Sequence, residues 1–499
     1  MKLFKIDLFA RNTFPVVLPA FLLLLTWLSF AVGVNAQFYS VDVRVWGGQQ
    51  DDRGVRLIPL ENGNVLSLSS TNSTSDDQPQ VWVQRLDSAA QIVWETTLSN
   101  APLLQPVDAV EHADGRITVL SMRYANAADG YDWSFQTLDS LGVLLNSQSW
   151  GTAAWDIPLR CFDRSGELWS VGTSYATGSG DIQWTRHVWN EGNWALAAAT
   201  SWGSDAEEVL RDAHIQGDTL LAIVTLEGEQ RAQLISYDLN TESINWTYSS
   251  VWDIPTDGVA LEARGSTIAA LMNVITDEGS RLAMVCMSLA GDTLLEKIPG
   301  SGVDVAAFDL QWYSDSDFAT ISMTEGLGLG GEELLFSRWS AETGAWQGGP
   351  TFGTPWDERP ASMLTDDANR IWILGRSDGY SNGRDDVYLL QIPDAYVGLY
   401  AESLETNILD VTLGIERTPS MRSADWSVFP NPVSGTFEIS GYQPGQRWIV
   451  VDSQGRMVAH GQQPYADASC WPAGMFSLIC VDAREEIGSS RVLKLNVFH

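Results

Sequence analysis

Residues 45–73 read VWGGQQDDRGVRLIPLENGNVLSLSSTNS and contain most of a repeating structural unit. A Trp-Gly corner at Trp46 leads into an alternating stretch, then into a tight turn around Gly63, then into a second alternating stretch. Glycine and asparagine take positive φ angles at little cost, so such turns are typical of β-hairpins. The stretch therefore predicts a sharp corner followed by two antiparallel strands.

The hairpin turn recurs along the chain in steps of about 50 residues, which indicates a repeat protein. Five copies contain a glycine, and two later copies are degenerate. The glycine copies are centred on Gly63, Gly115, Gly166, Gly217 and Gly265, and the degenerate copies are 314–317 and 366–370. The sequence therefore predicts seven hairpins.

Two further features recur in phase with the hairpins. Aromatic-Gly corners begin at Trp46, Trp150, Trp202 and Phe352. An alternating strand follows each hairpin, as at 81–87, and in several copies a fourth strand, as at 92–98, leads to the next corner. Four short antiparallel strands per repeat predict the blades of a β-propeller.

The two ends of the repeat region complement each other. No clear fourth strand follows 387–393, whereas an alternating stretch at 38–46 precedes the first hairpin. An N-terminal strand that completes the last blade would leave no open edge. We therefore predict an all-β protein with a seven-bladed β-propeller over 37–394, six or eight blades being the alternatives. The first repeat resembles those of secreted bacterial propeller proteins, which implies a fold and no particular activity.

The N-terminal 36 residues are predicted to be a signal peptide. Lys2, Lys5 and Arg11 precede a long apolar stretch, and the small residues before Gln37 suit a signal peptidase. The alternative is an uncleaved membrane anchor, because the apolar stretch is long. With the signal peptide removed, we expect no transmembrane span.

The chain is strongly acidic, with a formal net charge of −34. Such a surface repels phosphate backbones, so we expect no nucleic-acid partner. Solubility outside the cell is one explanation of this acidity.

The four cysteines are too few for a disulfide scaffold in a chain of 499 residues. Cys161 and Cys286 fall in separate repeats and are predicted to be buried small residues. Cys470 and Cys480 are close enough in sequence to pair, and the sequence leaves open whether they do.

The repeat ends before 395–425, which is polar in its last part and is predicted to be a linker. Residues 426–499 then begin in a different style, with VFPNPVSGTFEIS at 428–440. Two prolines fix an extended backbone before an alternating strand. Further alternating stretches follow, so we expect a small C-terminal β-sandwich.

This C-terminal segment resembles the sorting domain of the type IX secretion system of Bacteroidota. The resemblance is carried by FPNPVSGTFEI, VVDSQGRMV, PAGMFSLICV and the terminal VLKLNV, in that order. The motif residues are Pro430, Asn431, Pro432, Asp452, Gly455, Arg456, Gly474 and Lys494. The resemblance implies that the secretion machinery binds 426–499 and exports the protein through the periplasm to the outer-membrane surface or the medium. The alternative is an ordinary β-sandwich that binds carbohydrate or packs on the propeller.

Acidic residues recur at the corners that open each blade. They are Asp51, Asp156, Asp205, Asp253, Asp304 and Asp357, with Trp155 and Trp356 in the same loops. One interpretation is that the acids cap turns. The other is a ligand or cation face, on which the tryptophans contact a glycan or a protein. The loop 377–386 gives weak calcium candidates at Asp378, Asp385 and Asp386, and no other cofactor is predicted.

No catalytic motif is evident in the sequence. The five histidines form no metal-ligand pair, and no Gly-x-Ser-x-Gly motif occurs. The leading hypothesis is therefore a non-enzymatic, secreted or surface-displayed binding or adhesion module. The alternative is a hydrolase or lyase that acts on polysaccharide through carboxylates of the acidic face. A third possibility is a structural surface component.

Overall fold

The computed structural model describes the repeat region almost completely and the C-terminal region in short stretches. The described residues are 40–73, 79–99, 103–126, 130–276, 279–300, 303–325, 331–353, 357–378, 385–393, 405–413, 427–429, 435–440, 447–451, 457–461, 463–469, 471, 474–481 and 491–497. All regular elements within these ranges are β-strands. The predicted signal peptide lies outside the described residues.

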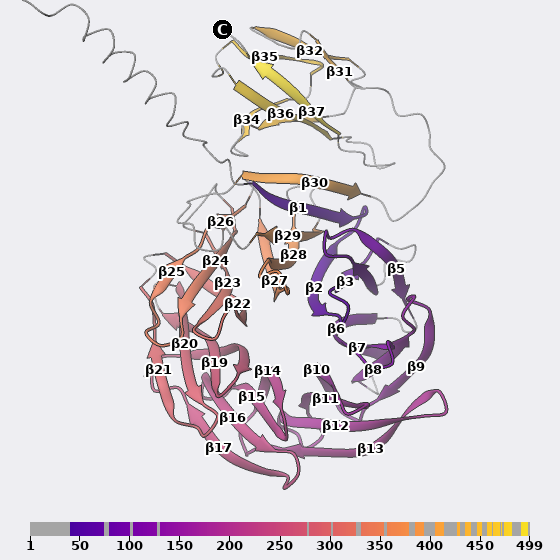
Figure 1. The fold of residues 1–499 in the computed structure, drawn as a ribbon, viewed down its shortest axis with the longest axis vertical. Helices are drawn as coiled ribbons and strands as arrows, with labels where there is room; N and C mark the ends of the chain where they lie inside the picture. The colour runs from indigo at the N-terminus through magenta and orange to yellow at the C-terminus, as the bar shows by residue number, and fades with distance from the viewer. Residues whose placement is uncertain are drawn as a thin grey trace, which may run out of the picture. The chain divides into compact units, whose positions relative to one another are not determined.

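Seven sheets form a ring, so the predicted seven-bladed propeller is confirmed (Figure 1). Blade 1 consists of β2 (Asp52–Pro59), β3 (Val65–Thr71), β4 (Gln80–Leu86) and β5 (Ile92–Leu98). Blade 2 consists of β6 (Leu103–Glu111), β7 (Ile117–Asn126), β8 (Gly130–Leu138) and β9 (Leu144–Trp150). Blade 3 consists of β10 (Asp156–Arg164), β11 (Glu167–Ser174), β12 (Asp181–Asn190) and β13 (Asn193–Trp202). Blade 4 consists of β14 (Glu208–Gln216), β15 (Thr219–Leu226), β16 (Arg231–Asp238) and β17 (Ser243–Ser249).

The remaining blades follow the same order, with a broken outer strand in blade 6. Blade 5 consists of β18 (Thr256–Arg264), β19 (Thr267–Thr276), β20 (Gly279–Ser288) and β21 (Thr293–Lys297). Blade 6 consists of β22 (Val305–Trp312), β23 (Asp317–Thr324), β24 (Glu333–Ser340), β25 (Trp346–Gly348) and β26 (Thr351–Phe352). Blade 7 contains β27 (Glu358–Thr365), β28 (Ile371–Ser377) and β29 (Asp386–Ile392).

The N-terminal strand closes the ring, as the sequence predicted. β1 (Ser40–Gly47) pairs antiparallel with β29, with Val43 opposite Leu390. β30 (Glu405–Leu413) then pairs parallel with β1. Because β30 lies within the predicted linker 395–425, part of that segment extends the last blade, and only the remainder can act as a connection.

In six of the seven blades, the hairpin between the first two strands contains the predicted residue with a positive φ angle, and the turn of blade 6 at 314–317 contains none. The glycines Gly63, Gly115, Gly166, Gly217 and Gly265 have φ angles of 75°, 81°, 82°, 61° and 59°. In the degenerate copy of blade 7, Asn369 supplies the positive φ, at 55°. The periodic turn signal therefore corresponds directly to the blade count.

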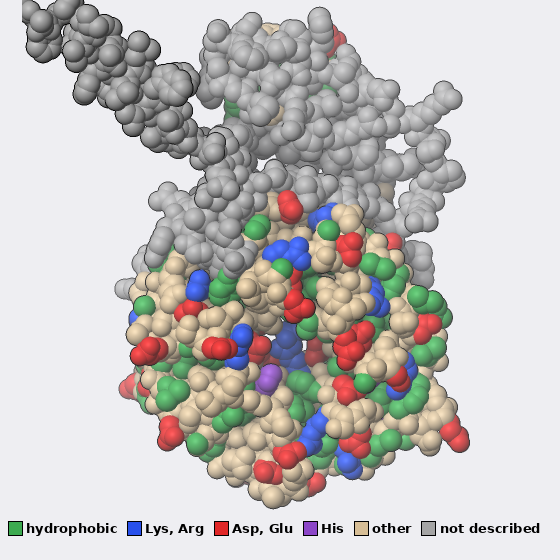
Figure 2. Space-filling model, viewed as in Figure 1, with side chains coloured by type: hydrophobic (Ala, Val, Ile, Leu, Met, Phe, Trp, Pro, Cys, Tyr) green, Lys and Arg blue, Asp and Glu red, His purple; other side chains and the backbone are tan. Residues whose placement is uncertain are grey.

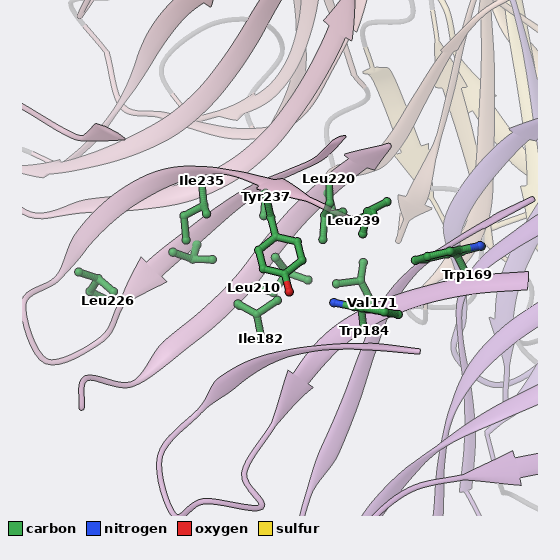
Figure 3. Close-up of a cluster of buried hydrophobic side chains, with 13 residues drawn as sticks. Trp169, Val171, Ile182, Trp184, Leu210, Leu220, Leu226, Ile235, Tyr237 and Leu239 are labelled. Carbon is green, nitrogen blue, oxygen red and sulfur yellow. The ribbon is translucent and has the colours of Figure 1, made fainter. Parts of the chain in front are cut away.

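Large apolar side chains fill the space between blades. Figure 3 shows one such cluster, in which Trp169 and Trp184 of blade 3 lie near Tyr237 of blade 4. The indoles of Trp169 and Trp184 stack with ring centroids 5.1 Å apart. Trp202, a corner tryptophan, stacks on Tyr237 at 5.2 Å. This corner tryptophan thus joins blades 3 and 4.

Cys161 and Cys286 are buried and unpaired, as predicted. Cys470 lies outside the described residues, so a disulfide to Cys480 stays a prediction.

The C-terminal strands form two small sheets. One contains β31 (Ser427–Phe429), β32 (Thr436–Ser440) and β35 (Tyr465–Asp467), and the other contains β34 (Met457–Gly461), β33 (Arg447–Val451), β36 (Gly474–Val481) and β37 (Arg491–Val497). Buried side chains of both sheets, among them Phe437 and Trp448, belong to one apolar cluster.

Candidate ligand-binding face

The first strand of each blade lies nearest the centre of the ring and is the inner edge of its sheet (Figure 1). All seven of these strands contain a β-bulge at the same place. A bulge inserts one residue and re-aims the side chains that follow it. The residues after the bulges are Arg56, Asp108, Arg160, Asp212, Ala260, Asp309 and Ser362, which we call the channel ring.

The channel ring satisfies backbone amides of the inner strands. Asp212 accepts a hydrogen bond from the amide of Ala213 through Oδ1 at 2.8 Å and from that of Leu261, in the next blade, through Oδ2 at 2.9 Å. Asp309 does the same with Leu310 at 2.9 Å and Met363 at 2.8 Å.

Asp108 and Ser362 complete this pattern. Asp108 accepts hydrogen bonds from the amides of Ala109 and Cys161. Ser362 accepts from the amide of Leu57 at 3.2 Å, across the closure of the ring. Three aspartates and one serine therefore provide acceptors for the amides that follow all seven ring positions.

Burial dominates the electrostatics of the channel ring. It raises the pKa of Asp108, Asp212 and Asp309 to about 6, against the opposing effect of Arg56. Arg160 pairs with Asp212 at 2.6 Å. These carboxylates are structural acceptors at fixed positions, with their oxygens already occupied.

A cavity of about 540 Å³ opens beside the channel, at the end where the corners lie. Residues of blades 6, 7, 1 and 2 line it, so it spans the closure of the ring. Val55, Pro106, Phe308 and Met323 give it apolar walls, and three arginines line it as well. The volume lies in the range of small-molecule sites. Figure 2 shows the ring hollowed at its centre, with acidic and basic side chains around the hollow. We call this cavity the mouth pocket.

The three arginines of the mouth pocket are Arg53, Arg359 and Arg376. Asp385 Oδ2 contacts Arg53 Nε at 2.9 Å and Arg376 Nη1 at 2.6 Å. Arg359 pairs with Glu332. Asp385 directly precedes the third strand of blade 7, and Glu332 directly precedes that of blade 6. The pairs Arg53–Asp385 and Arg359–Glu332 therefore occupy equivalent positions between successive blades.

Local backbone structure sets the position of Arg359. Gly375 of β28 lies against β27, and a Cβ atom there would stand 2.2 Å from the carbonyl oxygen of Arg359. Only glycine permits this close approach of the two strands, just before the bulge of β27. The arginine side chain is therefore held at the pocket by a rigid element.

An exposed aromatic group lies at the same end of the propeller, at the junction of blades 2 and 3. Trp155 is 55% exposed and meets Tyr131 edge-on, with ring centroids 5.3 Å apart. Tyr131 in turn lies 5.2 Å from Tyr124. Gly130 has a φ of 70°, and a side chain there would collide with the indole of Trp155. We call Tyr124, Tyr131 and Trp155 the aromatic ledge.

The structure separates the predicted acidic residues into different environments. Asp156 is fully buried and accepts a hydrogen bond from the amide of Thr152 at 2.5 Å, so its prediction as part of an exposed ligand face is corrected. Its carboxylate folds back to cap the corner, because the corner amides need acceptors. Asp205 and Asp253 are exposed.

Other predicted acids also make local contacts. Asp304 accepts from the amide of Ser280 at 2.6 Å, and Asp357 from that of Glu332 at 3.1 Å. Asp51 contacts Arg53 at 3.4 Å. Trp356 lies outside the described residues.

The three weak calcium candidates have different environments. Asp378 accepts a hydrogen bond from the amide of Asp357 at 2.9 Å, Asp385 pairs with two arginines, and Asp386 is buried. Among the residues that the structure describes, no group of three acidic, histidine or cysteine side chains could hold a metal ion. In the same residues, no helix is long and apolar enough to cross a membrane.

Six of the eight sorting-motif residues, the three of the Pro-Asn-Pro motif and Asp452, Gly455 and Arg456, lie outside the described residues. Gly474 begins β36, and Lys494 lies in β37 opposite Ser477.

The sequence interpretation missed the arginines of the mouth pocket. Arg53 and Arg359 both follow a buried acidic residue, Asp52 or Glu358, at the start of an inner strand. An acidic residue followed by arginine at the same place in two repeats was the signal that could have indicated them.

No protein-family model matches the chain, and no curated protein matches it in sequence. Solved structures with a similar fold include an ulvan lyase of polysaccharide lyase family PL25, with 9% identity, a TM-score of 0.46 and coverage of 72% of this chain and 97% of that chain. A putative 6-phosphogluconolactonase from Bacteroides fragilis has 12% identity, a TM-score of 0.44 and coverage of 70% and 93%. The NanB sialidase from Streptococcus pneumoniae has 12% identity, a TM-score of 0.37 and coverage of 68% of each chain. At such values, function has to be argued from the residues of this chain.

Proposed function

We propose that this protein is a secreted, non-enzymatic binding module whose propeller binds a glycan at the end that carries the aromatic ledge. The exposure of Trp155 beside Tyr131 is the observation that carries this proposal. An indole that is more than half exposed leaves apolar area that a ligand can bury, and burying that area favours binding. Flat aromatic faces suit the apolar faces of sugar rings, and the mouth pocket at the same end of the propeller offers polar groups that could orient the ligand.

The test is a glycan array with the full chain lacking residues 1–36, followed by calorimetry with the best ligand. Trp155→Ala should weaken binding at least tenfold, because a central tryptophan in an interface contributes about 2 kcal/mol or more. Trp346→Ala is the matched control, since Trp346 is also exposed, at 46%, but belongs to the outer strand of blade 6. Equal affinities of both variants would contradict the proposal, and shortening of the bound polymer would favour the enzymatic alternative.

We propose further that residues 426–499 form a small β-sandwich that directs export by the type IX secretion machinery. The two C-terminal sheets with a shared apolar cluster support an independent unit. In a host that has this system, deletion of 426–499 should leave the propeller in the periplasm. Replacement of Asp452, Gly455 and Arg456 tests the motif without removing the unit, and fractionation followed by surface proteolysis measures both. Surface delivery of the deleted chain would contradict the sorting role.

A further inference from the structure

We propose that the glycan is acidic and that the mouth pocket binds its carboxylate or sulfate groups through Arg53, Arg359 and Arg376. This inference rests on the proposed glycan-binding function and adds the chemical class of the ligand.

The first argument is the concentration of cationic groups. The chain carries 29 basic against 63 acidic residues, yet three guanidinium groups line this one cavity. They come from two blades that meet where the ring closes. A strongly acidic protein repels polyanions in general, so binding of an acidic polymer needs a local group of this kind.

The second argument is the number of unused donors. Each guanidinium has about five N–H groups, and contacts with carboxylates of the described residues occupy at most two of them on any of the three arginines. Arg53 and Arg359 are 48% and 38% exposed at the side chain, so their remaining donors are accessible. Guanidinium groups bind planar carboxylates and sulfate oxygens through paired hydrogen bonds.

The third argument is preorganisation. Asp385 holds Arg53 and Arg376 on one oxygen, and Glu332 holds Arg359. These carboxylates reduce the entropy that the arginine side chains would lose on binding. The lining of the cavity still carries three guanidinium groups and one carboxylate, that of Glu332, because Asp385 and Asp51 contact the arginines without belonging to the lining.

The fourth argument is the wall of the cavity. Phe308, Met323 and Pro360 offer apolar surface next to the arginines. A sugar ring has an apolar face and carries its charged substituent at the edge. A uronate or a sulfated sugar matches both features, whereas an isolated inorganic anion would leave the apolar wall uncovered.

Four polymers test this inference by calorimetry with the chain lacking residues 1–36. Polygalacturonate and its methyl ester share a backbone and differ in the carboxylate, and carrageenan and its desulfated form share a backbone and differ in sulfate. We expect the charged member of at least one pair to bind at least tenfold more tightly, with affinity that falls as salt rises. Whichever pair shows the difference identifies carboxylate or sulfate as the ligand group.

Single variants locate the effect. Arg359→Gln and Arg376→Gln should each weaken the acidic polymer about ten- to hundredfold, since a hydrogen bond to a charged group is lost. Arg359→Lys, which keeps the charge without the planar fork, should have an intermediate effect. Arg211→Gln is the control, because Arg211 pairs with Glu227 and Asp257 at the same end but lies outside the pocket. Its affinity should stay within twofold of the wild type.

The outcomes separate this inference from the function on which it rests. If Trp155→Ala weakens binding while the arginine variants do not, or if charged and neutral polymers bind equally, the acidic-ligand inference is wrong and glycan binding stands. If none of the four polymers binds, the inference is wrong for uronate and sulfate alike. If no glycan of the array binds either, the proposed function fails with it.

Discussion

The channel ring lies on the inner strands, which also supply most of the lining of the mouth pocket, and the two sites use their charges in opposite ways. Asp309 of β22 is 4% exposed, and both of its carboxylate oxygens accept from backbone amides. Arg359, in the neighbouring strand β27, is 38% exposed at the side chain and has one carboxylate contact. Ser362 lies three residues beyond Arg359 in the same strand. Its hydroxyl accepts a hydrogen bond from the backbone amide of Leu57, as the other acceptors of the channel ring do for neighbouring amides.

The difference shows how one repeat can combine stability and function. The inner strand is a sheet edge whose amides need acceptors, and the bulge turns the next side chain toward them. Arg53 and Arg359 precede the bulges of their strands and line the mouth pocket. Their side chains contact carboxylates and do not cap backbone amides of the inner strands. A charge in this protein therefore has to be judged by its place relative to the bulge.

The largest effect is expected from removing a double acceptor of the channel ring. Asp309→Ala leaves two buried amides, of Leu310 and Met363, without their partners. At about 1–3 kcal/mol for each buried group, the free energy of unfolding should fall by about 4 kcal/mol. Urea denaturation at pH 7 measures it.

Ser362→Ala is the graded control for this prediction. It removes one acceptor, that of the Leu57 amide, and should cost about half as much. Two results would contradict the prediction: an equal loss of stability in both variants, or a loss of less than about 1 kcal/mol in Asp309→Ala. Either would mean that the loss of stability does not scale with the number of backbone amides left without an acceptor.

A second prediction concerns pH. Burial raises the pKa of Glu262 to about 7, although the amide of Trp312 donates to its carboxylate and opposes this shift. A carboxyl with a raised folded-state pKa binds its proton more tightly in the folded protein, so its contribution to stability is lost as pH rises from about 4 to 7.

Glu262→Gln tests this sign, because glutamine keeps a carbonyl acceptor for the Trp312 amide and carries no charge. The variant should match the wild type at pH 5 and exceed it by about 2 kcal/mol at pH 8. Buried histidines such as His187, whose pKa burial lowers to about 4, give the opposite slope in both proteins and cancel in the comparison. A variant less stable than the wild type at pH 8 would contradict the prediction.

The sequence predicted the fold well because its signals are local. Many tight hairpin turns favour a residue with positive φ, so Gly63 and its counterparts indicate six of the seven blades without reference to the others. The closure was also visible, because the N-terminal stretch had a strand pattern and no hairpin partner of its own.

The site was less predictable because it depends on the closure of the ring. Arg53 and Arg376 meet at Asp385 only when β1 has joined the last blade, and no spacing in the sequence encodes that meeting. The bulges are equally hidden, since an inserted residue such as Phe308 leaves the alternating pattern nearly intact. The sequence left both interpretations of Asp156 open, because a corner aspartate looks the same whether it faces solvent or folds back to cap.

The smallest effect on stability is expected at the mouth pocket. It gives the clearest contrast with the channel ring, where substitutions should lower stability. Arg359→Gln removes a partly exposed ion pair with Glu332 and should change the free energy of unfolding by less than about 1 kcal/mol. Arg160→Gln, at 11% exposure, removes the ion pair with the buried carboxylate of Asp212, which Arg56 still stabilises, and should cost about 2 kcal/mol. Urea denaturation of both variants, beside calorimetry with the acidic polymer, gives the comparison directly.

The two variants should therefore separate affinity from stability along the inner strands. We expect Arg359→Gln to lose affinity and keep stability, because its donors face the ligand, and Arg160→Gln to lose stability in proportion to its burial. A mouth variant that unfolded as readily as the channel variant would mean that the arginines of the pocket serve the ring closure, and the division of the inner strand at its bulge would fail.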